Sequence, residues 1–367
     1  MRSFRCVLSY VACIILAFSM TGFAADPASG KKLIEFGWDE PDPAFMRAHL
    51  AEMERTPFDG CVFHADAAGA EGKAVSFTWS GWGKQTFTLD QLQKPIADLK
   101  ATPFNTFKEN FFRFNTTPAD VDWFDDYSAI VNNCKVAAQF VRESKCAGIL
   151  FDTEQYTGKL FNYPSQRDAK TKSFDEYAKQ VRKRGREVME AFQAGDPDIK
   201  LFLTFAYSLP WRQSQGDRAK LASAQYGLLA PFMDGMLDAA KGRSRIIDGY
   251  ESSYSFKDTS RFAPAYQTMK TGVLALVADR EKYKTHFSFG FGIWMDANWR
   301  RVGWHTDDLA KNFYSPEAFE KTVKTALDQS DEYVWIYSES PKWWTAQGKP
   351  DKLPEAYEQA IRKAAGR

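Results

Sequence analysis

The chain has 367 residues, and its 48 lysines and arginines nearly balance its 47 aspartates and glutamates, which leaves a net charge of +1. No global electrostatic field therefore draws it to nucleic acid or to an anionic membrane. Hydrophobic residues make up 44% of the sequence, as in a globular protein, and aromatic residues make up 15%, more than an ordinary core uses. We expect part of this aromatic surplus to line a binding cleft.

The first 24 residues are organised like a secretory signal peptide. Arg2 and Arg5 precede an apolar run at 6–20, and small residues follow it up to Ala24. Cleavage after Ala24 would leave a mature chain that begins near Ala25 and is exported to the periplasm or the extracellular space. The alternative is a retained membrane anchor, which is disfavoured because the apolar run is shorter than the roughly 20 residues of a spanning helix.

Three cysteines lie beyond the proposed cleavage site: Cys61, Cys134 and Cys146. An odd number argues against a disulfide scaffold. We expect buried free thiols. The alternative is one bridge between Cys134 and Cys146.

Short apolar runs alternate with longer stretches of helical period, which is typical of βαβ units in a parallel sheet. The expected strands are 32–38, 60–64, one within 105–114, 148–154, 200–207, 244–251, 287–295 and 332–339. The expected helices are 43–55, 88–100, 121–143, 173–193, 228–240, 261–284, 316–330 and 354–363. Residues 76–87 read as a loop or a hairpin insertion after the second strand.

Eight such units predict an α/β fold, a single (β/α)8 TIM barrel that spans residues 25–367 as one catalytic domain. The alternatives are an open doubly wound sheet and two smaller α/β domains. The sequence contains no Gly-rich strand-to-helix turn of the nucleotide-binding kind and no long linker between its halves. A single barrel is therefore favoured.

The active site of such a barrel lies at the carboxyl ends of its strands, and in this sequence those ends are rich in carboxylates. The acidic residues concerned are Asp39, Glu40, Asp66, Asp152, Glu154, Asp248, Glu251, Asp296 and Glu339. We expect the chemistry to depend on them.

The fourth strand carries the most informative pair. Because side chains alternate across a strand, Leu150, Asp152 and Glu154 share one face. If that face points inward, two carboxyl groups enter the barrel mouth together, and the one in the drier position has its pKa raised toward a value that suits a general acid. The alternative is a solvated acidic strand end or an ion pair with a helix N-terminus.

An apolar strand that ends Asp-x-Glu, followed by a strand with Tyr next to an acid and a last strand with Trp, resembles the barrel glycoside hydrolases. The nearest pattern is that of the chitinase-like family, whose fourth strand ends Asp-x-Asp-x-Glu. Asp152 and Glu154 match its last two acids, whereas Leu150 stands at the first. The resemblance implies that Glu154 is the general acid/base and that Asp152 is its partner, which would orient an N-acetyl group acting as nucleophile.

In the commoner two-carboxylate mechanism, a second acid faces Glu154 across the scissile bond, roughly 5 Å away for retention or roughly 6.5 to 9.5 Å for inversion. Glu251 and Glu339 are the candidates. Glu251 is preferred because its strand lies closer to the fourth strand around the ring. Either residue could instead bind a sugar hydroxyl.

Aromatic residues gather at the strand ends, where their planes can pack on the C–H faces of sugar rings. Trp335 shares a strand face with Glu339 and is a candidate floor for a sugar subsite. The side chains expected to bind substrate are Trp38, Asp39, His64, Asn115, Tyr156, Tyr250, Trp294, Asp296 and Trp335. The alternative for about half of the aromatic residues is that they cap or fill the barrel.

Only His64, of the four histidines, stands at a strand end, and neither H-x-H nor H-E-x-x-H occurs. We therefore expect no metal and no cofactor. The segment 76–84 is a candidate wall of the site or, alternatively, a surface hairpin.

The sequence thus predicts an exported glycoside hydrolase that acts on a poly- or oligosaccharide. Two alternatives remain open: a barrel that binds carbohydrate without catalysis, and a hydrolase with a metal held by Asp39, His64 and Asp152. The oligomeric state stays open as well.

Overall fold

A computed structural model describes residues 30–367. In it, nine strands form one parallel sheet in the order β10-β11-β1-β2-β5-β6-β7-β8-β9. They are β1 (Lys32–Gly37), β2 (Gly60–Phe63), β5 (Phe111–Asn115), β6 (Gly148–Asp152), β7 (Lys200–Leu203), β8 (Arg245–Asp248), β9 (Phe287–Phe289), β10 (Phe291–Trp294) and β11 (Tyr333–Ser338). Each lies within a range expected from the sequence, except that β5 extends one residue beyond 105–114, to Asn115. The proposed signal peptide lies outside the described residues.

The two outer members of this order, β9 and β10, are halves of the expected seventh strand. Only Gly290 separates them, and its backbone N–H still donates to the Asp248 carbonyl at 2.9 Å. Because β9 pairs with β8 and β10 pairs with β11, the sheet closes into a ring. The predicted (β/α)8 TIM barrel is confirmed.

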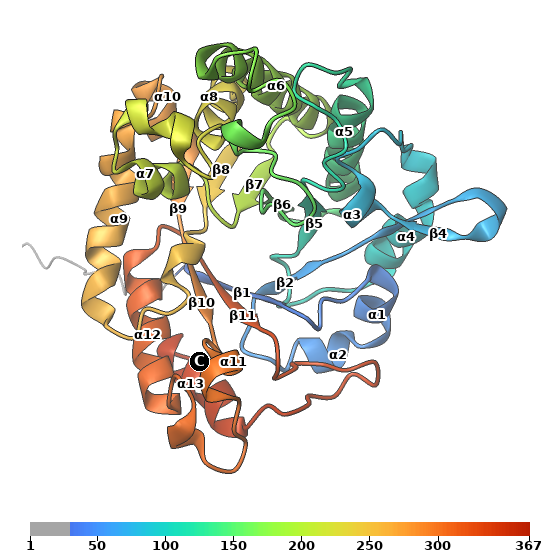
Figure 1. Cartoon of the computed structure of the whole chain (residues 1–367). Helices are drawn as coiled ribbons and strands as arrows, with labels where there is room; N and C mark the ends of the chain where they lie inside the picture. The colour runs from blue at the N-terminus through green and yellow to red at the C-terminus, as the bar shows by residue number, and fades with distance from the viewer. Residues whose placement is uncertain (1–29) are drawn as a thin grey trace, which may run out of the picture.

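Helices surround this barrel (Figure 1). Those of the first half are α1 (Pro43–Ala48), α2 (Leu50–Met53), α3 (Phe77–Ser80), α4 (Gln93–Ala101), α5 (Ser128–Ser144) and α6 (Phe174–Gly195). Those of the second half are α7 (Ser208–Ser214), α8 (Leu229–Ala239), α9 (Phe262–Lys270), α10 (Arg280–His286), α11 (Trp299–Val302), α12 (Pro316–Gln329) and α13 (Glu355–Ala364). None of the helices within 30–367 has the length and apolarity needed to cross a bilayer.

Three expected helices differ from the structure. The segment 43–55 breaks at His49 into α1 and α2. The segment 261–284 splits into α9 and α10, with Gly272 between them and Asp279 capping α10 through a bond from the Lys282 N–H. Each break follows from local backbone geometry that an averaged helical period does not reveal.

The expected helix 121–143 begins only at Ser128, as α5. The side chains of Asp122 and Asp126 accept backbone N–H groups of Phe124 and Ser128 at 3.0 and 2.9 Å. Such local bonds hold the preceding residues in turns, because they compete with the helical hydrogen bonds.

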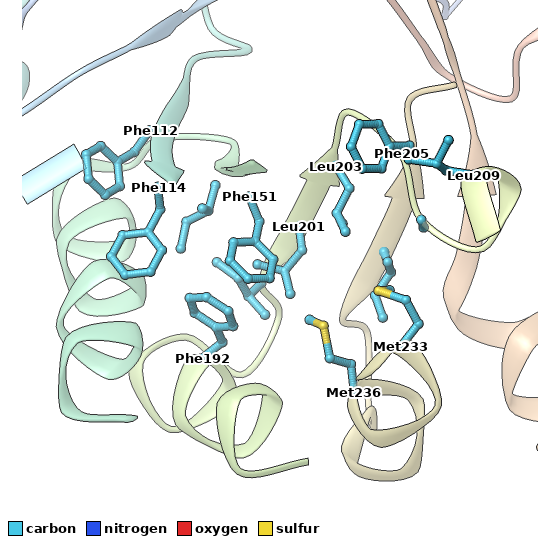
Figure 2. Packing of buried hydrophobic residues seen from close by; sticks show 14 of the residues in the cluster. Phe112, Phe114, Phe151, Phe192, Leu201, Leu203, Phe205, Leu209, Met233 and Met236 are labelled. Carbon is cyan, nitrogen blue, oxygen red and sulfur yellow. The ribbon is translucent and has the colours of Figure 1, made fainter. Parts of the chain in front are cut away.

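Two apolar layers hold the barrel together. The inner layer fills the ring with Ile34, Phe36, Val62, Phe111, Leu150, Phe202, Ile247, Tyr333 and Trp335. The outer layer lies between strands and helices, and Figure 2 shows it where Phe112, Phe114, Phe151 and Leu201 face Phe192 of α6 and Met236 of α8. This alternation of neighbouring residues between the two layers directs every second side chain of a strand into the barrel.

Cys61, Cys134 and Cys146 are free, as expected, and the alternative bridge between Cys134 and Cys146 is not formed. Burial raises the pKa of the Cys61 and Cys134 thiols well above the ordinary range. They act as small apolar groups of the core.

Candidate active site

A cavity of about 810 Å³ opens at the carboxyl ends of the strands. Its lining residues are Phe36, Gly37, Trp38, Glu40, His64, Asp66, Ser76, Trp79, Arg113, Glu154, Tyr156, Thr204, Glu251, Tyr254, Trp294, Tyr337 and Glu339. Its size is within the range of ligand sites, and polar groups converge on it from most strands.

The cavity brings together seven of the residues expected from the sequence: Trp38, His64, Glu154, Tyr156, Glu251, Trp294 and Glu339. The other six expected residues, Asp39, Asn115, Asp152, Tyr250, Asp296 and Trp335, do not line it. Five of these six hold a residue or a loop of the site instead, and the Tyr250 ring packs in the outer layer.

Asp152 lies at the end of β6 and is completely buried. Its carboxylate accepts hydrogen bonds from Arg113 Nη2 and the Tyr156 hydroxyl, both at 2.9 Å, and from the Glu154 N–H at 3.0 Å. These bonds occupy the carboxylate, so Asp152 orients the residues around it. Asp152 does not line the cavity, so it is not placed to orient an N-acetyl group of a substrate.

The strand expected over 148–154 ends at Asp152, and Glu154, two residues beyond its end, projects into the cavity. Burial raises the pKa of Glu154, and the charge of Asp152 raises it further. A hydrogen bond from Tyr156 and the charge of Arg113 act in the opposite direction.

Glu251 enters the cavity from the turn that follows β8. Its backbone N–H donates to the Thr204 carbonyl at 2.9 Å, and Tyr250 before it has a left-handed backbone with φ 43°. Burial, and then the charges of Glu154 and Asp152, raise the pKa of Glu251 to about 8. Glu251 therefore keeps its proton at neutral pH beside the Glu154 carboxyl.

The same left-handed residue explains why Tyr250 misses the cavity. Its ring packs against Phe256 and Phe291 in the outer layer, with ring centroids 6.2 and 5.9 Å apart. The turn thus directs Glu251 inward and Tyr250 away.

Glu339 lines another part of the cavity. Burial raises its pKa, and the charge of Asp296 does so too. The Tyr337 hydroxyl lies 3.3 Å from Glu339 Oε1. The charge of Glu154 is instead one of the causes that raise the pKa of Glu251.

Asp296 and Asp39 hold the end of β11 and the loop after it. Asp296 accepts the backbone N–H groups of Glu339 and Ser340 at 3.0 and 2.8 Å. Asp39 accepts the N–H groups of Trp343 and Trp344. Both carboxylates bind these backbone donors and lie outside the cavity wall.

Trp335 lies one layer below the cavity, because it precedes Tyr337 by two residues on the same face of β11. It is 1% exposed and donates from Nε1 to the Gly249 carbonyl at 2.8 Å. Tyr254 and Tyr337 lie above it, stacked at 5.4 Å with 13° between their planes. The aromatic floor of the cavity is therefore this tyrosine pair and not Trp335.

Arg113 is the main site residue that was not predicted. It stands on β5 with only 11% of its side chain exposed, and it donates to Glu40 Oε2, Asp152 Oδ2 and Asn115 Oδ1, each at 2.9 Å. The bond to Asn115 explains why that amide lies under the cavity wall. A charged residue between phenylalanines that face the outer layer was the sequence signal for an inward-facing arginine.

The segment 76–84 contributes to the wall. It begins at β4 (Ala74–Ser76), which pairs with β3 (Asp66–Ala68) as a hairpin, and continues into α3. Trp79 is 41% exposed, packs edge-on against Tyr156 at 5.2 Å and has the Arg113 guanidinium 4.9 Å from its ring centroid. The segment is thus both a hairpin and a wall, anchored by the buried Phe77 and Trp82.

The metal alternative lacks a ligand set. Within residues 30–367, no three His, Cys, Asp or Glu side chains come together in an arrangement that could hold a metal ion. Asp39 and Asp152 bind backbone amides and Arg113 respectively, and only His64 of the suggested trio lines the cavity. The trio is not assembled.

No family model matches the sequence, and no curated protein matches it. Among solved structures, a family 5 glycoside hydrolase from Prevotella bryantii has a TM-score of 0.48 at 11% identity, covering 92% of this chain and 97% of its own. A family 10 endo-β-1,4-xylanase has a TM-score of 0.43 at 12% identity, covering 93% and 98%. A putative chitinase A from Streptomyces coelicolor has a TM-score of 0.40 at 11% identity, covering 92% and 99%.

These neighbours are glycoside hydrolases of several families. The match of Asp152 and Glu154 to the chitinase-like motif stays a prediction.

Proposed function

We propose that this protein is a glycoside hydrolase that cleaves poly- or oligosaccharides with Glu154 and Glu251 as its two catalytic carboxyl groups. The observation that carries this proposal is that both side chains line one cavity and that the charge of Glu154 helps to keep Glu251 protonated. An ionised carboxyl beside a protonated one is the pair that acid/base cleavage of a glycosidic bond requires.

Burial raises the pKa of both carboxyl groups, and the charge of Glu154 helps to raise that of Glu251 to about 8. We therefore assign the proton donor to Glu251 and the carboxylate on the other side of the bond to Glu154. This division differs from the chitinase-like resemblance, which gives the acid/base role to Glu154. A donor is needed most when the leaving group is poor. The Glu251→Gln variant should therefore still cleave aryl glycosides with activated leaving groups, whereas Glu154→Gln should lose them as well.

The surroundings of the pair fit a sugar substrate. Trp38, Trp79 and Tyr156 are among the few large apolar side chains of residues 30–367 that are strongly exposed, and all three line the cavity. Sugar rings present C–H faces to such planes, and the polar groups between them can bind hydroxyls.

The test is a screen of the purified protein against neutral oligosaccharides and aryl glycosides, with Glu154→Gln and Glu251→Gln beside the wild type. We expect each variant to lose about 10²- to 10⁴-fold in kcat on oligosaccharides while it keeps its fold and its affinity. Glu339→Gln is the matched control and should lose much less. Binding without turnover by the wild type would refute the hydrolase and support the alternative of a non-catalytic carbohydrate-binding barrel.

We also propose that the protein is exported to the periplasm or the extracellular space, because residues 1–24 have the order of charged, apolar and small residues that a signal peptide has. Its partner there is the carbohydrate substrate.

A further inference from the structure

A second pocket, of about 480 Å³, adjoins the catalytic cavity. Its walls are Trp38, Asp39, Glu40, Pro41, Asp42, Phe45, His64, Lys342, Trp344, Thr345, Ala346 and Asp351. Trp38, Glu40 and His64 also line the cavity, so the two hollows share a wall. The second pocket comes from the loops after β1 and β11 and contains neither Glu154 nor Glu251.

Trp38 stands at this shared wall and is 60% exposed. Its orientation is fixed, because Nε1 donates to the Tyr337 hydroxyl at 3.0 Å and the Lys342 ammonium lies 5.6 Å from its ring centroid. The indole therefore presents a fixed, exposed apolar plane between the two hollows.

The charge around the second pocket limits what it can bind. Four carboxyl-bearing residues, Asp39, Glu40, Asp42 and Asp351, line it together with the single cation Lys342. An anionic sugar would meet this acidic wall unfavourably. A neutral sugar can use the carboxylate of Asp351, and the Asp42 oxygen that does not cap α1, as hydrogen-bond acceptors for its hydroxyl groups.

We propose that the second pocket is a further sugar subsite, occupied by a distal unit of a neutral oligosaccharide that extends from the catalytic cavity past Trp38. The inference rests on the proposed function and names its substrate class, a neutral glycan longer than the cavity alone can hold. Chain length should therefore raise affinity and kcat/KM until the second pocket is filled.

Ala346 offers a clean test, because it is exposed and lines the second pocket but not the cavity. The Ala346→Trp variant fills the pocket and leaves the catalytic residues in place. Ala219→Trp is the matched control, since Ala219 is an exposed alanine in another surface pocket, between α6 and α8. The probes are neutral cello-, xylo-, manno- and chito-oligosaccharides from the disaccharide to the hexasaccharide, with oligogalacturonides as the anionic comparison.

Two readouts keep this inference separable from the proposed function: kcat/KM, and calorimetric affinity measured in the Glu154→Gln background. For at least one neutral oligosaccharide series, we expect the longest members to bind roughly tenfold more tightly than the shortest. One additional sugar ring that stacks and forms hydrogen bonds in the second pocket provides this gain. Ala346→Trp should abolish this gain and leave the shortest substrate unchanged, and Ala219→Trp should retain it. Oligogalacturonides should show no gain.

Length-dependent binding that Ala346→Trp abolishes, in a protein without turnover, would refute the hydrolase and keep the subsite. The subsite is overturned if affinity does not rise with length for any probe, or if Ala346→Trp preserves the rise. Equal loss on the shortest and longest substrates would overturn it as well, because it would show damage to the cavity itself.

Discussion

Glu251 illustrates how single residues of this site depend on their neighbours. Burial, and then the negative charges of Glu154 and Asp152, raise its pKa to about 8. A carboxyl group whose pKa is set by another carboxyl reports any change at that neighbour.

We therefore predict that Glu154→Gln lowers the pKa of Glu251, because the amide removes one of the charges that oppose its ionisation. Carboxyl-carbon NMR titration of the labelled protein measures the shift directly. Glu339→Gln is the control, since Glu339 is not among the groups that raise this pKa. An unchanged Glu251 titration in Glu154→Gln would mean that the two side chains do not interact.

Glu251 should also make stability depend on pH. Because its folded-state pKa lies above its ordinary value, the folded protein keeps a proton that the unfolded chain releases. The contribution of this proton to the free energy of unfolding is fully present below the ordinary carboxyl pKa and is lost as pH rises toward about 8. Urea unfolding between about pH 5 and 8 should show the wild type losing on the order of a few kcal/mol relative to Glu251→Gln; parallel pH profiles would contradict this.

Arg113 provides the positive charge that two carboxylates of the site need. We predict that Arg113→Met lowers the free energy of unfolding by about 3 to 5 kcal/mol, because it leaves Asp152 and Glu40 without their buried partner. Arg182→Met is the matched control: Arg182 pairs with Asp238 at 2.7 Å but is 40% exposed, so it should cost less than about 1 kcal/mol.

Chemical denaturation measures both arginine variants. Adding Asp152→Asn to Arg113→Met should recover part of the loss, since it removes one of the unpaired charges. If the double variant is no more stable than the single one, the ion pair is not the cause.

At the scale of elements, the ring closes through the interrupted strand formed by β9 and β10. Gly292 in β10 faces the barrel interior, where a Cβ atom would lie 2.5 and 2.6 Å from two carbons of the Trp335 indole. That indole is fully enclosed and bonded to the Gly249 carbonyl, so it cannot move aside.

Gly292→Ala is therefore predicted to destabilise the protein by about 1 to 3 kcal/mol through overpacking. Thermal or urea unfolding checks this. Gly158→Ala, whose nearest neighbour would be the Ala119 Cβ at 3.3 Å, is the control and should change stability little. A similar effect at both positions would show that the loss reflects glycine chemistry and not the Trp335 contact.

Elements with a strong local signal were predictable. The capping box of Ser173 and Glu176 marks the start of α6, and Ser315 followed by Pro316 marks the start of α12. The breaks at His49 and around Gly272 and the short helix α7 were not, because they depend on the backbone angles of a few residues, which an averaged helical period does not reveal.

At the scale of the whole molecule, the proposed export predicts that the chain is cleaved after Ala24. Expression of the full chain in a bacterial host should yield a processed protein in the periplasm or medium that begins at Ala25. N-terminal sequencing or intact-mass measurement checks the cleavage site. Retention of the full-length chain in the membrane fraction would instead support the alternative of an N-terminal anchor.

Residue alternation and apolar periodicity are local properties, so the barrel and the place of Leu150, Asp152 and Glu154 near the end of the fourth strand could be predicted from the sequence. The set of polar groups that face the cavity could not. Asp152, which looked catalytic, is held by Arg113, while the left-handed turn at Tyr250 directs Glu251 into the cavity that Glu154 also lines. Burial and the pairing of charges depend on neighbours that are distant in the sequence, so the sequence of one strand does not specify them.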